Sequence, residues 1–144
     1  MKRQLYSHRL ARKRAFKFRW FHPIHHYMTV PSKLEFWTPN EATKYGETSG
    51  DICGVNLGNG HSCTENGTCL MQFSGMQDED GKDIYEADIL EDEHGRDLVE
   101  FKNGAFCIGE ISFPQMKQKD GRLLGFKVCG NLLQHSHLLP EEKR

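Results

Sequence analysis

The pattern of apolar and polar residues changes character at residue 15. Large apolar side chains are sparse in residues 1–14 and follow no period, which indicates a flexible arm or a short marginal helix. Beyond that point aromatic and basic residues alternate, in the order Phe16, Lys17, Phe18, Arg19 and Trp20. A period of two is typical of a half-buried strand, and two further short strands are expected over 27–30 and 34–37.

Residues 38–69 are rich in Gly, Asn, Thr and Ser and hold few large apolar side chains. This composition predicts a long loop or a loosely built insert. Structureless loops longer than about 15 residues are uncommon inside compact domains, so the length of the segment is itself unusual.

From Leu70 onward, strand and turn signals follow one another closely. Asn103-Gly104 predicts a type I′ hairpin, because that turn needs a positive φ at both central residues, and Asp120-Gly121 predicts another. The expected strands cover residues 70–74, 84–85, 89–90, 97–101, 105–112 and 123–128. Short strands at this spacing predict a mainly β protein, built as a small barrel or sandwich.

The formal net charge of −1 over 144 residues conceals a strong segregation of charge. Residues 1–34 hold nine basic residues and no acidic one, whereas residues 78–100 hold eleven acidic and two basic residues. A net charge close to zero therefore excludes only a protein that is basic throughout its length. No apolar run approaches the roughly 18 residues of a transmembrane helix, so no membrane association is expected.

The N-terminal sequence lacks the apolar stretch of about 7–15 residues that a secretory signal needs. Its Arg-rich, acid-free start also resembles an organellar transit peptide, a reading that requires a eukaryotic source. Five cysteines, an odd number, favour reduced thiols and a cytoplasmic protein. Cys107 and Cys129 fall in expected strands and are interpreted as small core residues rather than nucleophiles.

One group of candidate metal ligands lies in the insert: Cys53, His61, Cys63 and Cys69. Thiolate and imidazole are the ligands that zinc prefers, and a core-poor segment would gain stability from a bound metal. The spacing C-x7-H-x-C-x5-C lacks the usual closely paired cysteines, so a loop with reduced thiols is the alternative. No other cofactor is expected.

The acidic run from Asp78 to Asp83 invites comparison with a calcium-binding loop. If Gly81 occupies the sixth loop position, Met76 and Ala87 fall at the first and twelfth positions, where carboxylates are required. The run is therefore interpreted as a solvated acidic turn. Phosphate-binding loops, nucleophile elbows and zinc-protease motifs are all absent from the sequence, which predicts that the protein is not an enzyme.

The basic N-terminal stretch offers phosphate neutralisation and aromatic stacking together. Its candidate nucleic-acid contacts are Arg9, Arg12, Lys13, Arg14, Lys17, Arg19 and Trp20. Two other interpretations stay open. The stretch pairs with the acidic residues 78–100 of the same or a neighbouring chain, or it is a solubilising tail.

Residues 71–89 carry a run that resembles the signature of the YopX family of phage and prophage proteins, M-Q-[YF]-[TS]-G-x-x-D-x-x-G-x-x-I-Y-E-G-D-I. Two shorter segments, Lys17-Phe18-Arg19-Trp20 and Val128-Cys129-Gly130-Asn131-Leu132, resemble the opening and closing strands of that family. The residues that match the signature and the closing strand are Gln72, Gly75, Asp78, Gly81, Ile84, Tyr85, Glu86, Asp88, Gly130 and Asn131.

The resemblance implies an SH3-like β-barrel over residues 70–140. The sequence itself places a β segment with its insert over 15–69 and a basic arm over 1–14 before the barrel, and the family has no counterpart for the arm or the insert. The resemblance also implies a cytoplasmic protein of a bacterial host cell, encoded by a phage or an integrated element, and no particular reaction. Ala87 stands where the family has Gly, so the bend there is either compatible with a right-handed conformation or slightly strained.

These observations predict a non-enzymatic binding or assembly protein, whose target is a protein partner or a second copy of itself in a homo-oligomer. The alternative is a nucleic-acid-binding accessory protein that uses the basic stretch.

Overall fold

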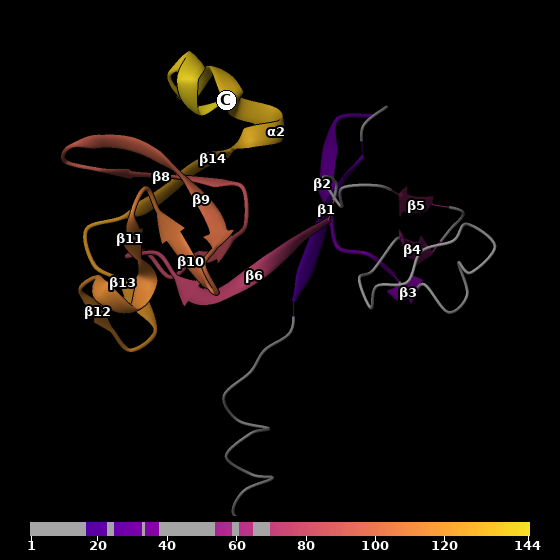
Figure 1. Cartoon of the computed structure of the whole chain (residues 1–144), viewed down its shortest axis with the longest axis horizontal. Helices are drawn as coiled ribbons and strands as arrows, with labels where there is room; N and C mark the ends of the chain where they lie inside the picture. Colours follow the sequence, from indigo (N-terminus) through magenta and orange to yellow (C-terminus); the bar gives the residue numbers. More distant parts are fainter. Residues whose placement is uncertain (1–16, 23–24, 33, 38–53, 59–60, 65–69) are drawn as a thin grey trace, which may run out of the picture. The chain divides into compact units, whose positions relative to one another are not determined.

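The computed structural model describes residues 17–22, 25–32, 34–37, 54–58, 61–64 and 70–144 of the chain. The polypeptide divides into two compact units (Figure 1). The N-terminal unit spans Phe18–Met71, and the C-terminal unit comprises Gln72–Arg144 together with Lys17. Each unit has its own buried apolar cluster and is described separately below.

The N-terminal unit contains a hairpin and a three-stranded sheet. Strand β1 (Phe18–His22) pairs antiparallel with β2 (Tyr27–Thr29). Strands β3 (Glu35–Trp37), β4 (Gly54–Gly58) and β5 (His61–Thr64) follow in the sheet order β3-β4-β5. The buried apolar cluster of the N-terminal unit consists of Trp20 and Leu57, with Leu34 and Leu70 packed against them. The three strands expected before residue 38 are confirmed.

Two expectations for this unit are wrong in detail. The segment 38–69 is not a loop throughout, because β4 and β5 lie within it and pair with each other and with β3. Strand β1 is not half-buried with alternating sides, since Trp20, Phe21 and His22 are all buried. The histidine ring stacks on Tyr27 at 5.2 Å between centroids and accepts a hydrogen bond from the His25 backbone N–H, which explains how a polar residue is accommodated there.

The C-terminal unit contains two sheets. The first sheet is built on strand β6 (Leu70–Gln77), of which residues Gln72–Gln77 belong to this unit. Strand β6 pairs with β7 (Asp83–Tyr85) and with β13 (Arg122–Leu123). Strand β12 (Gln118–Lys119) pairs with β13 in turn. The other has the order β11-β10-β9-β8-β14, formed by β8 (Asp88–Asp92), β9 (Gly95–Lys102), β10 (Ala105–Ile108), β11 (Ile111–Ser112) and β14 (Lys127–Asn131). Short helices complete the unit: η2 (Phe113–Gln115), α2 (Leu132–His135), η3 (Ser136–Leu138) and η4 (Glu141–Lys143).

The core of the C-terminal unit is apolar and drawn from both sheets. Its buried members are Ile84, Leu90, Val99, Ile108, Phe113 and Leu123. The prediction of a mainly β protein is confirmed, but the two sheets remain separate and no closed barrel forms among the described residues. No helix in the described part of the chain is long and apolar enough to span a membrane.

Both predicted hairpin turns are confirmed by their backbone angles. Asn103 and Asp120 have φ of 53°, and the glycine after each has φ of 78°, which are the signs that a type I′ turn requires. The single strand expected over 105–112 is instead two strands, because Gly109 (φ 58°) and Glu110 form a turn between β10 and β11. The strand expected over 123–128 is likewise interrupted, at Leu124-Gly125.

Ala87 has a φ of 65°, in the left-handed region. The bend is therefore strained, and it does not adopt the right-handed conformation that was the alternative. Backbone hydrogen bonds hold the residue there, since its N–H donates to Val99 and its carbonyl accepts from Leu132. We expect Ala87→Gly to stabilise the C-terminal unit by about 0.5–1 kcal/mol in urea unfolding, because glycine adopts this conformation without strain. Ala105→Gly, in strand β10, serves as the control and should destabilise by a similar amount; two changes of the same sign would contradict the explanation.

Candidate binding groove

Asp78 uses its carboxylate entirely for backbone contacts. It is 2 % exposed, and Oδ1 accepts hydrogen bonds from the backbone N–H groups of Asp80 (3.0 Å) and Lys82 (2.8 Å). Oδ2 accepts a third from Val128 (2.9 Å), 50 residues further along the chain. The run at 78–83 therefore forms an acidic turn, but the interpretation as a solvated turn is wrong for Asp78, whose buried carboxylate joins β14 to the end of β6.

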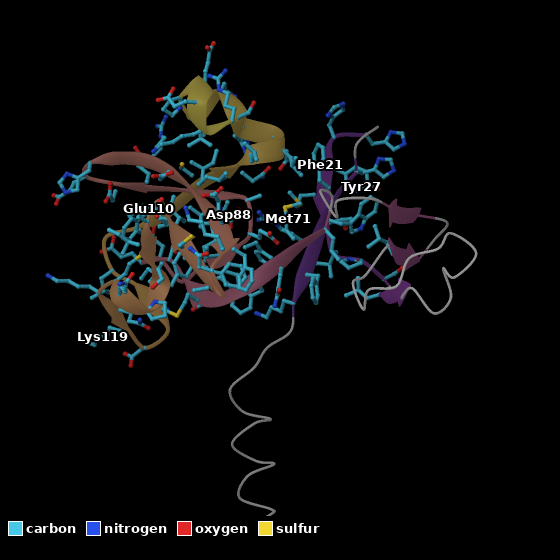
Figure 2. The ribbon with its side chains drawn as sticks, viewed as in Figure 1. Phe21, Tyr27, Met71, Asp88, Glu110 and Lys119 are labelled. Atoms are coloured by element: carbon cyan, nitrogen blue, oxygen red, sulfur yellow. The ribbon has the colours of Figure 1, made fainter. Side chains whose placement is uncertain are left out.

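Three more signature residues also shape the backbone. Asp88, 1 % exposed (labelled in Figure 2), accepts a hydrogen bond from the Tyr85 N–H at 2.8 Å. Asn131 caps α2 by accepting from the Gln134 N–H. Gly130 leaves room for the ring of His135, since a Cβ there would lie 2.8 Å from that ring.

The remaining signature residues have structural positions as well. Gly75 and Gly81 have φ of 87° and 84°, and Ile84 is fully buried in the core. The half-buried Tyr85 packs on Phe73 with ring centroids 5.6 Å apart. Gln72 is exposed and its carbonyl accepts from the N–H of the half-buried Glu86. The signature thus specifies turns, a cap and core packing.

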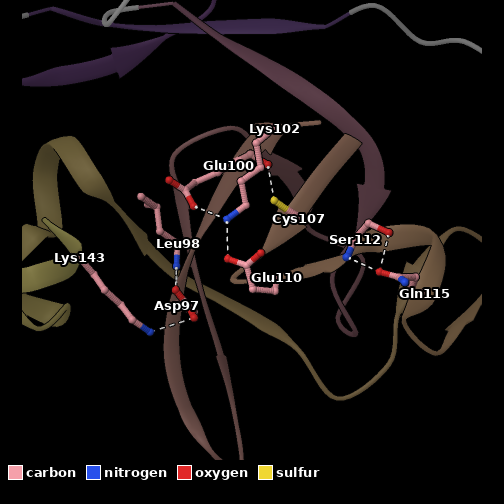
Figure 3. A network of polar contacts seen from close by, with 9 residues as sticks. All are labelled: Asp97, Leu98, Glu100, Lys102, Cys107, Glu110, Ser112, Gln115 and Lys143. Atoms are coloured by element: carbon pink, nitrogen blue, oxygen red, sulfur yellow. Dashed lines mark hydrogen bonds and ion pairs between the residues drawn. The ribbon is translucent and has the colours of Figure 1, made fainter. Parts of the chain in front are cut away.

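Side chains cover the outer edges of the five-stranded sheet. At β11, the Ser112 N–H donates to Oε1 of Gln115 (3.0 Å), as Figure 3 shows. At β14, the Val128 N–H donates to Asp78 and the Asn131 N–H donates to Nδ1 of His135 (3.1 Å). Covered edges resist pairing with a strand from another chain, so a partner of this sheet would have to use a face or a groove.

A groove runs between the sheet and the C-terminal segment. It consists of two hollows, of about 500 and 250 Å³, and both are lined by Asp97 and Lys143. The Lys143 ammonium forms an ion pair with the Asp97 carboxylate at 2.9 Å (Figure 3), and this pair therefore contributes to the walls of both hollows. We call the two hollows together the strap groove, because Lys143, the last residue of η4, lines both of them.

The two hollows differ in chemistry. The larger has Leu98 and Leu132 beside the carboxylates of Glu100 and Glu142. The smaller combines apolar and charged walls. Its apolar side chains are Leu90, Ile108, Ile111, Met116 and Phe126, and its polar ones are Asp92, His94, Arg96, Asp97 and Lys143. Ile111 is 54 % exposed although it belongs to the core-facing side of its strand, where it lies opposite Ile108. Concave sites with apolar walls and a few charged groups are typical binding sites.

Of the predicted nucleic-acid contacts, three lie in the described residues. Lys17 forms an ion pair with Asp83 at 2.9 Å and lies 4.7 Å from the Phe73 ring centroid. This contact joins the basic stretch to the acidic region of the same chain, as one of the interpretations expected. Trp20 is 5 % exposed and offers no stacking surface, which corrects that part of the prediction, and Arg19 is half-buried. Arg9, Arg12, Lys13 and Arg14 lie outside the described residues.

The Lys17–Asp83 pair predicts a specific pH dependence. The hydrogen bond from Lys17 lowers the pKa of Asp83, against the opposing effect of partial burial. A lowered pKa in the folded state gives stability that is present above about pH 4 and lost as the pH falls through the folded value. In urea unfolding between pH 6 and pH 2.5, we expect Asp83→Asn to lose less stability than the unsubstituted chain. Parallel pH profiles of the two proteins would contradict this assignment.

The candidate zinc ligands cannot be assembled from the described side chains. Cys53 and Cys69 lie outside the described residues, and His61 and Cys63 are described only as backbone in β5. Among the described residues, no three His, Cys, Asp or Glu side chains form a group suited to a metal ion. Cys107 is buried, as expected, whereas Cys129 is half-buried and partial burial raises the pKa of its thiol.

Comparisons with known proteins agree with this architecture. The family model described as "YopX protein" matches residues 17–140. The crystal structure of protein EF1440 from Enterococcus faecalis is similar, with a TM-score of 0.51 and 18 % sequence identity, over 88 % of this chain and 99 % of that one. At this identity the likeness concerns the fold alone. No curated protein matches the sequence.

Proposed function

The chain belongs to the YopX family, and on that premise we propose that it is a non-enzymatic binding or assembly protein, encoded by a phage or prophage and acting in the cytoplasm of the host cell. Its target is a protein partner or a second copy of itself, held in the strap groove. The observation that carries this proposal is the exposed Ile111 in the smaller hollow, which the Asp97–Lys143 ion pair also lines.

The chemistry of the signature supports a binding role over a catalytic one. General acids and bases need a polar group that can reach a substrate. Asp78 and Asn131 instead direct their side-chain oxygens to backbone N–H groups, and Asp88 is 1 % exposed. The groove, by contrast, combines solvent access with apolar and charged side chains, a mixture that suits contact with another polypeptide.

Self-association is tested by measuring molar mass in solution over a range of concentrations. We expect the mass of the unsubstituted chain to rise with concentration, and Ile111→Lys to shift this rise to at least tenfold higher concentration. Leu124→Lys is the matched control, because Leu124 is 41 % exposed and does not line the strap groove. A monomer at every concentration would exclude self-association, and an equal effect of both substitutions would exclude the groove as the site.

A second candidate function is nucleic-acid binding through the basic N-terminal stretch, whose sequence contains six Lys and Arg and no Asp or Glu within residues 1–14. Phosphate contacts make affinity strongly dependent on salt. The test measures binding of labelled DNA and RNA at low and raised salt, with and without residues 1–14. Unchanged affinity after truncation, or no binding at low salt, would exclude this function.

A further inference from the structure

We infer that the β12–β13 hairpin and the adjoining turn between β6 and β7 form a surface that binds the phosphate backbone of duplex DNA. Four exposed basic residues define this basic hairpin surface: Lys82, Lys117, Lys119 and Arg122. None of the four lines the strap groove, and none belongs to residues 1–14. The inference therefore goes beyond the proposed function and does not depend on it.

The four cations of this surface carry charge that no carboxylate compensates. Four other basic residues of the C-terminal unit form ion pairs with carboxylates of that unit: Arg96, Lys102, Lys127 and Lys143. Among the described residues, no such ion pair involves any cation of the basic hairpin surface. A partner that carries phosphates would supply the missing negative charge.

Backbone pairing and side-chain contacts place the four cations on one continuous surface. Gln77, near the turn between β6 and β7, is the register partner of Arg122 in β13. The Arg122 guanidinium lies beside Gly81, where an added Cβ would lie 3.0 Å from one of its nitrogens, and Lys82 follows in the chain. Lys119, labelled in Figure 2, is the partner of Arg122 across the hairpin.

The surface keeps an excess of positive charge after its own carboxylates are counted. Three exposed carboxylates belong to it: Glu79, Asp80 and Asp120. Asp80 forms an ion pair with Lys127 at 3.7 Å, so four exposed cations remain against the two carboxylates of Glu79 and Asp120. Residues 72–144 as a whole hold fifteen acidic and nine basic residues. The basic hairpin surface is thus a local positive region on an acidic unit.

The hairpin is fixed to the core, so its charges have defined positions. Leu123 is fully buried in the apolar cluster of the unit. The Gln118 side-chain amide donates to the Phe113 carbonyl at 3.3 Å, and the Leu124 N–H donates to the Lys117 carbonyl at 3.0 Å. A fixed array of cations suits the regularly spaced phosphates of a duplex.

Duplex DNA is the nucleic acid that this surface suits best. Proteins that bind single strands stack the bases on aromatic side chains. Among the described residues, the exposed large aromatic side chains are Tyr27 and Phe101, and neither belongs to this surface. Recognition of duplex RNA also uses its 2′-hydroxyl groups, whereas lysine ammonium groups act as point charges on phosphates. The contact we infer is therefore with the DNA backbone and carries no sequence specificity.

Binding of a fluorescein-labelled DNA duplex to the full chain tests the inference. Each phosphate contact contributes about 0.9 to the slope of log affinity against log salt concentration. We expect Lys119→Gln to lower this slope by about 0.9 and to weaken binding about threefold or more at low salt. Lys102→Gln is the matched control, because it removes the same charge from an ion-paired lysine of the same unit, and it should change the affinity less than twofold.

Removing a carboxylate from the surface should have the opposite effect. We expect Asp120→Asn to strengthen binding about threefold at low salt, because it removes repulsion between the hairpin tip and phosphate. Asparagine fits this turn position, since Asn103 has the same φ of 53° in the other type I′ hairpin. Glu110→Gln is the control, because it removes an exposed carboxylate from a different turn and should leave the affinity within twofold.

Three results would overturn the inference: no binding of duplex DNA by the full chain at low salt, equal effects within each pair of variant and control, or tighter binding of an RNA duplex of the same length. Every variant keeps residues 1–14, so the second candidate function is measured separately by their removal. Loss of DNA binding on that removal, with no effect of Lys119→Gln, would support the second candidate and overturn this inference. Self-association is likewise measured separately, by the effect of Ile111→Lys on molar mass.

Discussion

Replacing Asp78 with Ala is expected to destabilise the C-terminal unit by about 3–5 kcal/mol. Hydrogen bonds to an ionised acceptor are about twice as strong as neutral ones, and the substitution leaves three backbone N–H groups without their acceptor. Since small domains are stable by about 5–15 kcal/mol, this change removes a large part of the total.

The measurement is urea unfolding followed through the NMR signals of Ile84 and Leu90, which report the C-terminal unit alone. Asp80→Ala is the matched control, because the exposed Asp80 carboxylate makes a surface ion pair with Lys127 at 3.7 Å, and such pairs contribute about 0–1 kcal/mol. Equal losses for the two variants would show that the three hydrogen bonds of Asp78 do not carry the stability assigned to them.

Replacing Ile84 with Ala is expected to destabilise the same unit by about 3–4 kcal/mol. Its side chain is fully buried among Leu90, Val99 and Leu123, so the truncation removes apolar burial and leaves a cavity. Ile111→Ala removes the same atoms from a position that is 54 % exposed, and we expect it to reduce the free energy of unfolding by less than about 1 kcal/mol. The same urea experiment, followed here through the NMR signals of Leu90, checks both variants, and comparable losses would contradict the placement of the core.

Local sequence signals predicted much of the C-terminal unit. Asn103-Gly104 and Asp120-Gly121 have the φ angles that their turns require, because the turn type depends on the two central residues alone. The resemblance to the YopX family was confirmed by the match over residues 17–140. The structural roles of the signature residues could not be predicted from local sequence signals. The contact between Asp78 and Val128 joins residues 50 positions apart, and no local pattern encodes it.

Long-range geometry also explains what the sequence did not reveal about the candidate site. The strap groove depends on the pairing of Asp97 with Lys143, 46 residues later, and on the exposure of Ile111, which resembles any other strand residue. Trp20 was predicted to be available for stacking because it alternates with basic residues. The structure buries it against Leu57, a residue of the segment that was expected to be a loop.

The central claim is that the family signature builds the fold and leaves the groove for binding. Amide hydrogen exchange of the full chain at the N–H groups of Asp80, Lys82 and Val128 tests it most directly, because all three donate to Asp78. We predict that these amides are protected to nearly the same extent as the core strand residue Val99, and that Asp78→Ala abolishes the protection of all three together. Exchange of Asp80 and Lys82 at the rate of an open loop, with Asp78 intact, would contradict the claim.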